Sequence, residues 1–197
     1  TVIATRIDMI MLGSMEGLKD VGIYSIAMFM ASTIEVPRRA ILQSSAPVIR
    51  IFFKERNTEK VAQIQYKTIL NLILIGGFIL TLILVNLDSI YAIIPNGSVY
   101  AKGFWVVFFI GLAKISDMIA GSSDEILVSS KYYFYNFVFI LILTIISISF
   151  NYLLIPIYGL TGAAVATLIS SSIIVFIKSL VLRYLFGIKP YNLKMLG

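Results

Sequence analysis

Residues 132–177 read YYFYNFVFILILTIISISFNYLLIPIYGLTGAAVATLISSSIIVFI, and no Asp, Glu, Lys or Arg interrupts them. A single helix crosses the ~30 Å hydrocarbon core of a membrane with about 20 apolar residues, so this run is too long for one span. Pro156 cannot continue a helix, and Gly159 permits a tight turn. We therefore expect two membrane helices here, at about residues 132–155 and 160–184.

The same reasoning extends toward the start of the chain. Apolar stretches predict four further membrane helices, at about residues 3–18, 21–53, 68–87 and 103–130. Residues 106–112 and 137–146 are continuously apolar, whereas a transmembrane strand alternates apolar and polar residues. The sequence thus predicts an all-α membrane protein in which residues 1–197 form a single unit of six transmembrane helices.

The composition excludes several classes of protein. Apolar residues make up 59% of the chain and charged residues 13%, and the mean hydropathy is +0.95. A soluble domain has roughly 45–50% apolar and about 25% charged residues, so we exclude a soluble globule, a disordered chain, a coiled coil and a nucleic-acid-binding domain. The chain has neither Cys nor His, which excludes disulfides and membrane enzymes built on those residues. We expect no metal site and no enzyme activity.

The net charge of +6 indicates orientation in a membrane rather than a polyanionic partner. Basic residues concentrate in the connection between the second and third predicted helices, in the connection after the fourth, and in the tail. They are Arg50, Lys54, Arg56, Lys60 and Lys67, then Lys131, then Lys178, Arg183, Lys189 and Lys194. These connections all lie on one side of an alternating topology, so the connection at 54–67 and the C-terminus are expected to be cytoplasmic.

Three predicted helices also carry charge far from their ends, where ionisable groups are costly and usually face a bundle interior or a water-filled cavity. With a rise of about 1.5 Å per residue, Asp8, Glu35 and Lys114 lie roughly 14–20 Å from the outer ends of their helices. The complete set is Asp8, Glu35, Arg38, Arg39, Lys114 and Asp117.

Spacing along each helix allows these charges to neutralise one another. Lys114 and Asp117 are i,i+3 neighbours, and Glu35 precedes Arg38 and Arg39 by three and four residues. Two interpretations stay open: self-contained ion pairs that hold helices together, or a wet functional cavity. A cavity is favoured by the helix at 103–130, because one sector of about 100° holds Lys114, Asp117, Gly121, Asp124 and Glu125. The last two residues are expected near the inner interface, as a solvated helix end.

Glycine and proline mark points of bending or close packing. Pro37 lies in the middle of the predicted helix 21–53, and Gly76 and Gly77 lie midway along the helix at 68–87. Small residues at 162–166 form a face suited to tight contact with a neighbouring helix. Packing is one interpretation of the proline and the glycine pair, and a flexible point that lets a lobe rock is the other.

Three stretches resemble a known family. Residues 151–170, NYLLIPIYGLTGAAVATLIS, resemble the hairpin between the fifth and sixth helices of a lobe in polysaccharide-exporting flippases. Residues 8–13, DMIMLG, and 21–25, VGIYS, resemble the first helix of such a lobe and the turn after it, and Pro47 also matches. These flippases belong to the multidrug/oligosaccharidyl-lipid/polysaccharide exporter superfamily, and the resemblance covers nearly the whole chain.

The resemblance implies a transporter of two six-helix lobes related by pseudo-twofold symmetry. The hairpin looks more like that of the second lobe, and the chain begins without Met inside an apolar stretch. We therefore expect a fragment of a longer protein that lacks an N-terminal lobe. The implied activity is translocation of a lipid-diphosphate-linked oligosaccharide across the bacterial cytoplasmic membrane for surface polysaccharide synthesis. The implied partners are that lipid-linked substrate, membrane lipid and the N-terminal lobe, with no nucleic acid and no cofactor.

These implications give the buried charges roles. A diphosphate linker is anionic, and Arg presents a planar fork to phosphate oxygens, so Arg38, Arg39 and Lys114 are the candidate substrate-binding residues. The carboxylates Asp8, Glu35 and Asp117 are candidates for binding a coupling proton or sodium ion, or for tuning those cations. Alternating access rocks one lobe against the other around a site at the midplane and needs no covalent step.

Two other readings compete with the flippase. A drug/cation antiporter of the same superfamily needs an acidic cavity, but the buried set here is mixed. A membrane glycosyltransferase or polysaccharide polymerase needs large extramembrane loops with catalytic carboxylates or metal motifs. The longest connections predicted here are about 54–67 and 88–102, and the second has a single carboxylate, Asp88.

Overall fold

The computed structural model describes residues 6–187, and every regular element in that range is helical. Three stretches are long and apolar enough to cross a membrane: Thr58–Val85, Gly97–Ile119 and Phe134–Phe186. The prediction of an all-helical protein with membrane-spanning helices is therefore confirmed at this level. The expected start of the first helix near residue 3 and the tail residues Lys189 and Lys194 lie outside the described range, as does the C-terminus expected to be cytoplasmic.

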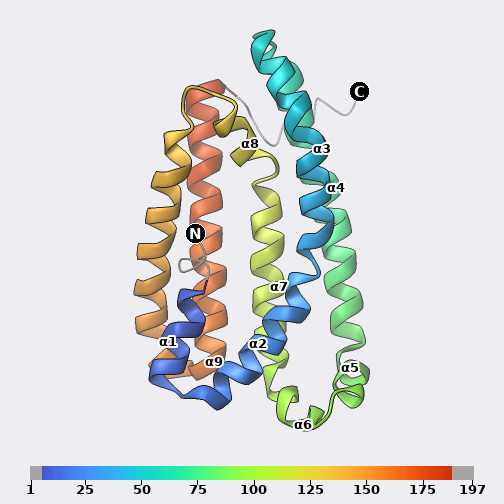
Figure 1. Cartoon of the computed structure of the whole chain (residues 1–197), viewed down its shortest axis with the longest axis vertical. Helices are drawn as coiled ribbons and strands as arrows, with labels where there is room; N and C mark the ends of the chain where they lie inside the picture. Colours follow the sequence, from blue (N-terminus) through green and yellow to red (C-terminus); the bar gives the residue numbers. More distant parts are fainter. Residues whose placement is uncertain (1–5, 188–197) are drawn as a thin grey trace.

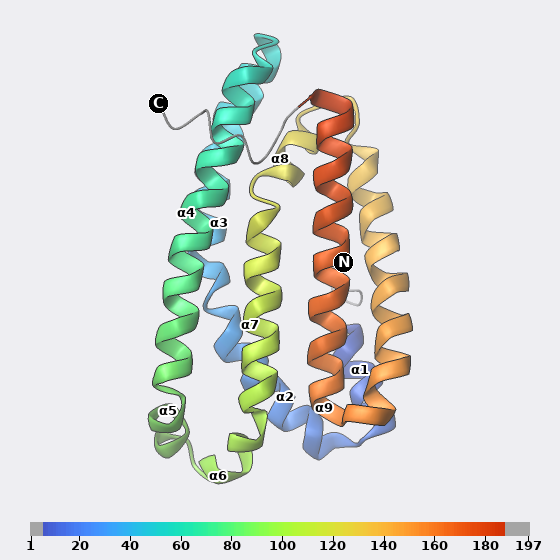
Figure 2. The same cartoon turned by 180° about the vertical axis from the view of Figure 1, so that it is seen from behind.

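The apolar run that begins the sequence argument forms α9, Phe134–Phe186, which reverses direction at Gly159 (Figures 1 and 2). Gly159 has φ 54° and ψ −132°, a backbone conformation that side chains with a Cβ rarely adopt. The two halves of α9 consequently lie side by side as an antiparallel hairpin. The break expected between Pro156 and Gly159 is confirmed, and it lies at the glycine.

The helix expected at 21–53 is instead two helices. After α1 (Ile7–Met15), helix α2 spans Leu18–Ser32 and α3 spans Glu35–Lys54. Pro37 has no N–H to donate to the carbonyl of Thr33, and its ring crowds that carbonyl. The Thr33 carbonyl accepts the N–H of Val36 instead, at 3.2 Å. Pro37 thus breaks the helix one turn upstream of itself and lets α3 leave at a different angle from α2 (Figure 1).

The prediction of a loop at 54–67 is wrong, because most of this stretch is helical. Helix α4 spans Thr58–Val85 and begins at Asn57, whose side chain accepts a hydrogen bond from the backbone N–H of Lys60 at 3.1 Å. Its first turns bury Val61 and Ala62 in a core cluster shared with α9. Buried apolar residues therefore extend the helix beyond the apolar run, and only a short turn joins α3 to α4.

The helix expected at 103–130 is also divided. Short helices α5 (Leu87–Ile93) and α6 (Gly97–Tyr100) and the 3₁₀ turn η1 (Ala101–Gly103) lead into α7 (Phe104–Ile119). Gly121, with φ 55°, then turns the chain into α8, Ser123–Val128. Because the chain turns at this glycine, the polar residues of α8 do not continue the face of α7.

The long helices run along one axis, so the bundle has two ends (Figures 1 and 2). We call the end with the α3–α4 turn and α8 the α8 end, and the opposite end, with α5 and α6, the α6 end. α7 packs between α9 and α4, α1 packs on α9, and α3 packs along α4. One core cluster around Tyr24 and Val107 joins α1, α2, α7 and α9, and a second around Ile126 and Phe139 joins α8 and α9 to α3 and α4.

Gly162 allows the two halves of α9 to approach closely, and we expect Gly162→Ala to destabilise the bundle by about 1–3 kcal/mol. A Cβ at this position would strike the backbone carbonyl of Leu154 on the other side of the reversal, and backbone cannot rotate away. The control is Gly77→Ala in α4, where a Cβ would meet nothing within 4 Å. Unfolding in detergent micelles measures both variants. Equal stabilities would contradict the close approach.

Candidate functional site

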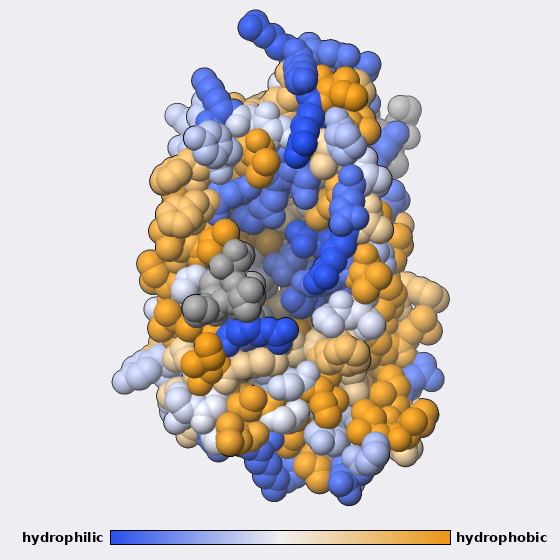
Figure 3. All heavy atoms as spheres, in the orientation of Figure 1, coloured by the Kyte–Doolittle hydropathy of each residue, from blue (hydrophilic) through white to orange (hydrophobic). Residues whose placement is uncertain are grey.

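A hydrophilic hollow opens on the face of the bundle shown in Figure 3, between apolar flanks. Toward the α8 end it contains a pocket of about 400 Å³ between α3 and α8, to which α3 contributes Arg39, Gln43 and Arg50 and α8 contributes Asp124 and Glu125. We use the term charged cleft for this pocket together with the ionisable side chains adjoining it. They are Glu35, Arg38, Arg39 and Arg50 of α3, Lys114 and Asp117 of α7, Asp124 and Glu125 of α8, and Lys178 of α9.

Helix α3 forms one wall of the cleft because it is strongly amphipathic. Leu42 and Ile49 are buried, with Ile49 in the core shared with α4, α8 and α9. Arg39, Gln43 and Arg50 are exposed and line the pocket. Spacings of four and seven residues relate Arg39, Gln43 and Arg50 to one another, and seven residues separate Leu42 from Ile49. The helical repeat therefore places each set on its own side of α3.

Glu35 and Lys114 form an ion pair across the cleft. The Lys114 Nζ donates to Glu35 Oε1 at 2.7 Å, and the two side chains are 19% and 18% exposed. Arg39 Nη2 also donates to Glu35, at 3.3 Å, from a side chain that is 74% exposed. The predicted Glu35–Arg39 pair is therefore present. Lys114 makes its ion pair with Glu35 of α3, whereas its expected interaction with Asp117 is electrostatic without an ion pair among residues 6–187.

Arg38 and Asp117 have no ion-pair partner within residues 6–187. The Arg38 Nε is buried and makes no hydrogen bond. Asp117 interacts electrostatically with Lys114, Arg38, Glu35 and Lys178, which places the carboxylate among three cations and one acid. The cleft therefore holds the Arg38 guanidinium and the Asp117 carboxylate, and neither forms an ion pair within the described part of the protein.

At the α8 side of the cleft, two sequence interpretations need correction. Lys178, counted as a basic residue of the tail, lies within α9 and donates to Asp124 Oδ1 at 2.7 Å. Asp124 and Glu125 are not simply a solvated helix end, because both line the pocket and Glu125 Oε2 is buried without a hydrogen-bond partner. The turn at Gly121 causes this, since it directs α8 toward α3.

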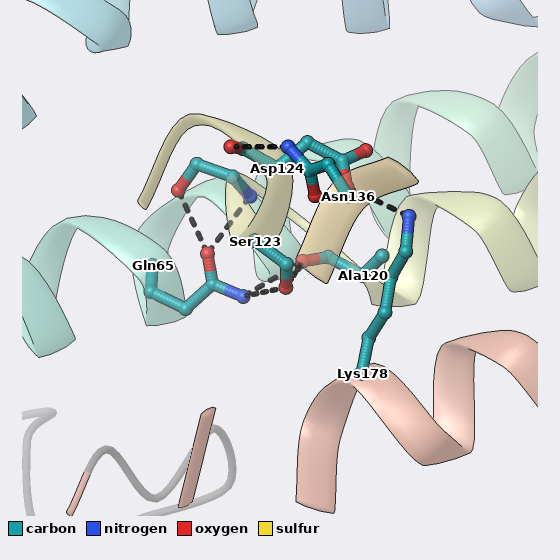
Figure 4. A network of polar contacts seen from close by, with 7 residues as sticks. Gln65, Ala120, Ser123, Asp124, Asn136 and Lys178 are labelled. Atoms are coloured by element: carbon teal, nitrogen blue, oxygen red, sulfur yellow. Dashed lines mark hydrogen bonds and ion pairs between the residues drawn. The ribbon is translucent and has the colours of Figure 1, made fainter. Parts of the chain in front are cut away.

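Gln65 of α4 fixes that turn from the other side (Figure 4). Its Nε2 donates to the Ala120 carbonyl at 2.8 Å and to Ser123 Oγ at 3.1 Å. Its Oε1 accepts the Ser122 N–H at 2.8 Å and the Ser122 Oγ at 2.7 Å. One buried amide thus provides hydrogen-bond partners for the polar groups where α7 ends and α8 begins. The sequence offered no signal for this role, because a lone Gln near a helix start is usually a surface residue.

Asp8 does not join the ion pairs of the cleft. It is 3% exposed, and its Oδ2 accepts the Tyr24 hydroxyl at 2.6 Å and the Thr167 hydroxyl at 3.5 Å. It therefore joins α1, α2 and α9 through neutral donors. Its burial was predictable from its depth, whereas its partners, Tyr24 and Thr167, come from helices whose packing the sequence does not reveal.

Comparisons with known protein families, with curated proteins and with solved structures found no match. Residues 6–187 contain no group of three or more Asp and Glu side chains placed to hold a metal ion. The chemistry of the cleft therefore has to be inferred from its own side chains. These are cations and carboxylates in nearly equal number, only partly paired, in a bundle that otherwise presents apolar flanks (Figure 3).

Proposed function

We propose that this chain is one lobe of a membrane transporter that translocates a lipid-diphosphate-linked oligosaccharide, with the charged cleft receiving the anionic linker. The observation that carries the proposal is Arg38, whose guanidinium lies in the cleft without an ion-pair partner in the described part of the chain. A guanidinium fork suits phosphate oxygens, and Arg39 and Arg50 line the adjoining pocket. No covalent step is required, so the proposed protein is not an enzyme.

The arrangement of helices supports the lobe. Six helical segments follow one another along the chain, two of which are interrupted by a turn. They are α1, the pair α2 and α3, α4, the pair α7 and α8, and each half of α9. We propose that these are the six membrane helices of the lobe and that an N-terminal lobe completes the transporter across the cleft. We place the α8 end on the cytoplasmic side of a bacterial cytoplasmic membrane, because Arg50, Lys54, Arg56 and Lys60 gather there.

In this scheme the paired and unpaired charges have different tasks. The Glu35–Lys114 pair joins α3 to α7, and Arg39 also contacts Glu35 from an exposed side chain. Of the three predicted substrate-binding residues, Arg38 is therefore the one without an ion-pair partner among residues 6–187. Arg38 and Arg39 bind the linker. Asp117 and Asp8 stay our candidates for a coupling proton or sodium ion, since each is a carboxylate without a cation partner among residues 6–187.

Arg38→Gln tests the proposal in the full-length protein. We expect surface polysaccharide to fall at least tenfold, the loss of about 1.4 kcal/mol or more of binding, while the protein is still made and inserted. The measurements are surface polysaccharide and the amount of lipid-linked intermediate retained in the cell. Arg183→Gln is the control, because Arg183 is an exposed arginine at the end of α9 outside the cleft. Normal export by the Arg38 variant would refute the assignment.

A cation antiporter is the second candidate function, because Asp124 and Glu125 line the same pocket and Glu125 has a buried, unpaired oxygen. An organic cation would bind these carboxylates rather than Arg38. Glu125→Gln would then abolish efflux of a fluorescent cation while Arg38→Gln left it intact. The opposite pattern, with export lost only in Arg38→Gln, supports the flippase.

A further inference from the structure

A second pocket, of about 690 Å³, lies at the α8 end, beyond the charged cleft. It forms where the end of α3, the end of α8 and the two termini of the α9 hairpin meet. Three cations line it, Arg50, Lys54 and Lys131, together with three aromatic side chains, Phe53, Tyr132 and Phe186. We call it the basic pocket. It shares Arg50, Val128 and Ser129 with the pocket of the charged cleft, and Arg50 is the one charged residue among these three.

The charge of the basic pocket differs from that of the cleft. No carboxylate lines it, and Arg50, Lys54 and Lys131 are exposed and form no ion pair with an acid of residues 6–187. Lys131 Nζ lies 5.1 Å from the centre of the Tyr132 ring, so one of these cations also contacts the aromatic wall. An uncompensated cluster of this kind attracts an anion, and phosphate is an anion that both Arg and Lys bind.

The walls of the pocket indicate what the anion is attached to. Phe186 packs edge-on against Phe53, at 5.4 Å between ring centres, and against Tyr132, at 5.8 Å. These rings lie where the charge-free run of residues 132–177 begins and where α9 ends, which is the boundary between apolar and polar surface. Aromatic side chains collect at that boundary in membrane proteins. The site thus offers cations on one side and an apolar wall on the other.

We propose that the basic pocket binds the phosphate headgroup of an anionic membrane phospholipid, with Lys54, Lys131 and Arg50 on the phosphate and the aromatic wall beside the start of the acyl chains. Basic pockets between membrane helices near the cytoplasmic surface bind anionic lipid headgroups in other membrane proteins. A free inorganic phosphate would leave the aromatic wall and most of the pocket volume unused. The proposal goes beyond the transport function and does not rest on it.

The test uses the full chain in neutral detergent micelles that contain equal amounts of phosphatidylglycerol and phosphatidylcholine, with bound lipid counted by native mass spectrometry. We expect phosphatidylglycerol to be retained in preference to phosphatidylcholine. The double variant Lys54→Gln/Lys131→Gln should reduce that preference by roughly tenfold or more, because each cation near a membrane surface contributes substantially to binding acidic lipid. Lys54→Arg/Lys131→Arg should keep the preference, since it keeps both charges.

The matched control is Lys19→Gln/Lys102→Gln, which removes two exposed lysines near the α6 end and changes the net charge equally. Circular dichroism confirms that all variants remain helical. An equal preference for phosphatidylglycerol in every protein overturns the proposal. So does an equal loss in both glutamine variants, because the effect then follows net charge. Displacement of the lipid by inorganic phosphate also overturns it, by showing a site for the free anion.

Discussion

Replacing Gln65 with leucine is expected to lower the free energy of unfolding by about 3 kcal/mol, because two buried polar groups lose their partners at once. The Ser122 N–H and the Ser122 hydroxyl both donate to Gln65 Oε1, at 2.8 and 2.7 Å, and Gln65 itself is 1% exposed. The Ala120 carbonyl loses a donor as well but still accepts the Ser123 N–H at 3.1 Å. Denaturant titration in micelles measures the change.

The control for this prediction is Gln63→Leu, two positions before Gln65 in α4 but exposed. It introduces the same side chain and removes the same amide, so any general effect of the substitution is shared. Gln65→Leu should also increase hydrogen exchange at the α7–α8 turn, because the turn residues are then held only by their own backbone bonds. Equal stability of the two leucine variants would mean that Gln65 does not fix the turn.

Lys114→Gln is expected to cost about 2–3 kcal/mol, because it leaves the carboxylate of Glu35 largely enclosed beside a neutral amide. The more exposed Arg39, at 3.3 Å, is then the ion-pair partner that remains among residues 6–187, and Arg38 acts on the carboxylate electrostatically. The double variant Lys114→Gln/Glu35→Gln should recover a substantial part of the loss, since the side chain that lost its partner then carries no charge. Unfolding of the two single variants and the double variant gives the coupling energy directly.

Lys102→Gln serves as the control for the ion pair, because Lys102 is exposed in the turn before α7 and has no ion-pair partner in the described range. We expect it to change stability by less than about 0.5 kcal/mol. Additive losses in Lys114→Gln and Glu35→Gln would show that the two side chains do not stabilise each other. The contact between α3 and α7 would then depend on apolar packing alone.

The sequence predicts features that a single stretch of chain determines. The break in α9 followed from a proline and a glycine within one apolar run, and the Glu35–Arg39 pair followed from a spacing of four residues. Gly76 fits the packing interpretation, since a Cβ there would strike Met118, whereas a Cβ at Gly77 would meet nothing within 4 Å and α4 continues through both. Such features depend on local sterics and helix periodicity, which the order of residues contains.

Features that depend on how helices are placed side by side were not predictable. Lys114 has an acid three residues ahead of it on its own helix, yet its partner is Glu35 on α3. Lys178 was counted as a basic residue of the tail, because charge counting assigns a cation near a helix end to the loop. The start of α4 at Thr58 depends on a core that α8 and α9 complete, and the apolar run alone does not reach it.

The reversal at Gly159 also bears on how the protein enters the bilayer. The chain turns between the halves of α9 with no charged residue from Tyr132 to Ile177, so the turn has nothing polar enough to hold it on the side of synthesis. Under the proposed orientation, we therefore expect the two halves to be delivered to the membrane together, as a helical hairpin whose tip crosses first. Lys131, just before the uncharged run, is then expected to stay on the side of synthesis and to oppose insertion in the other direction.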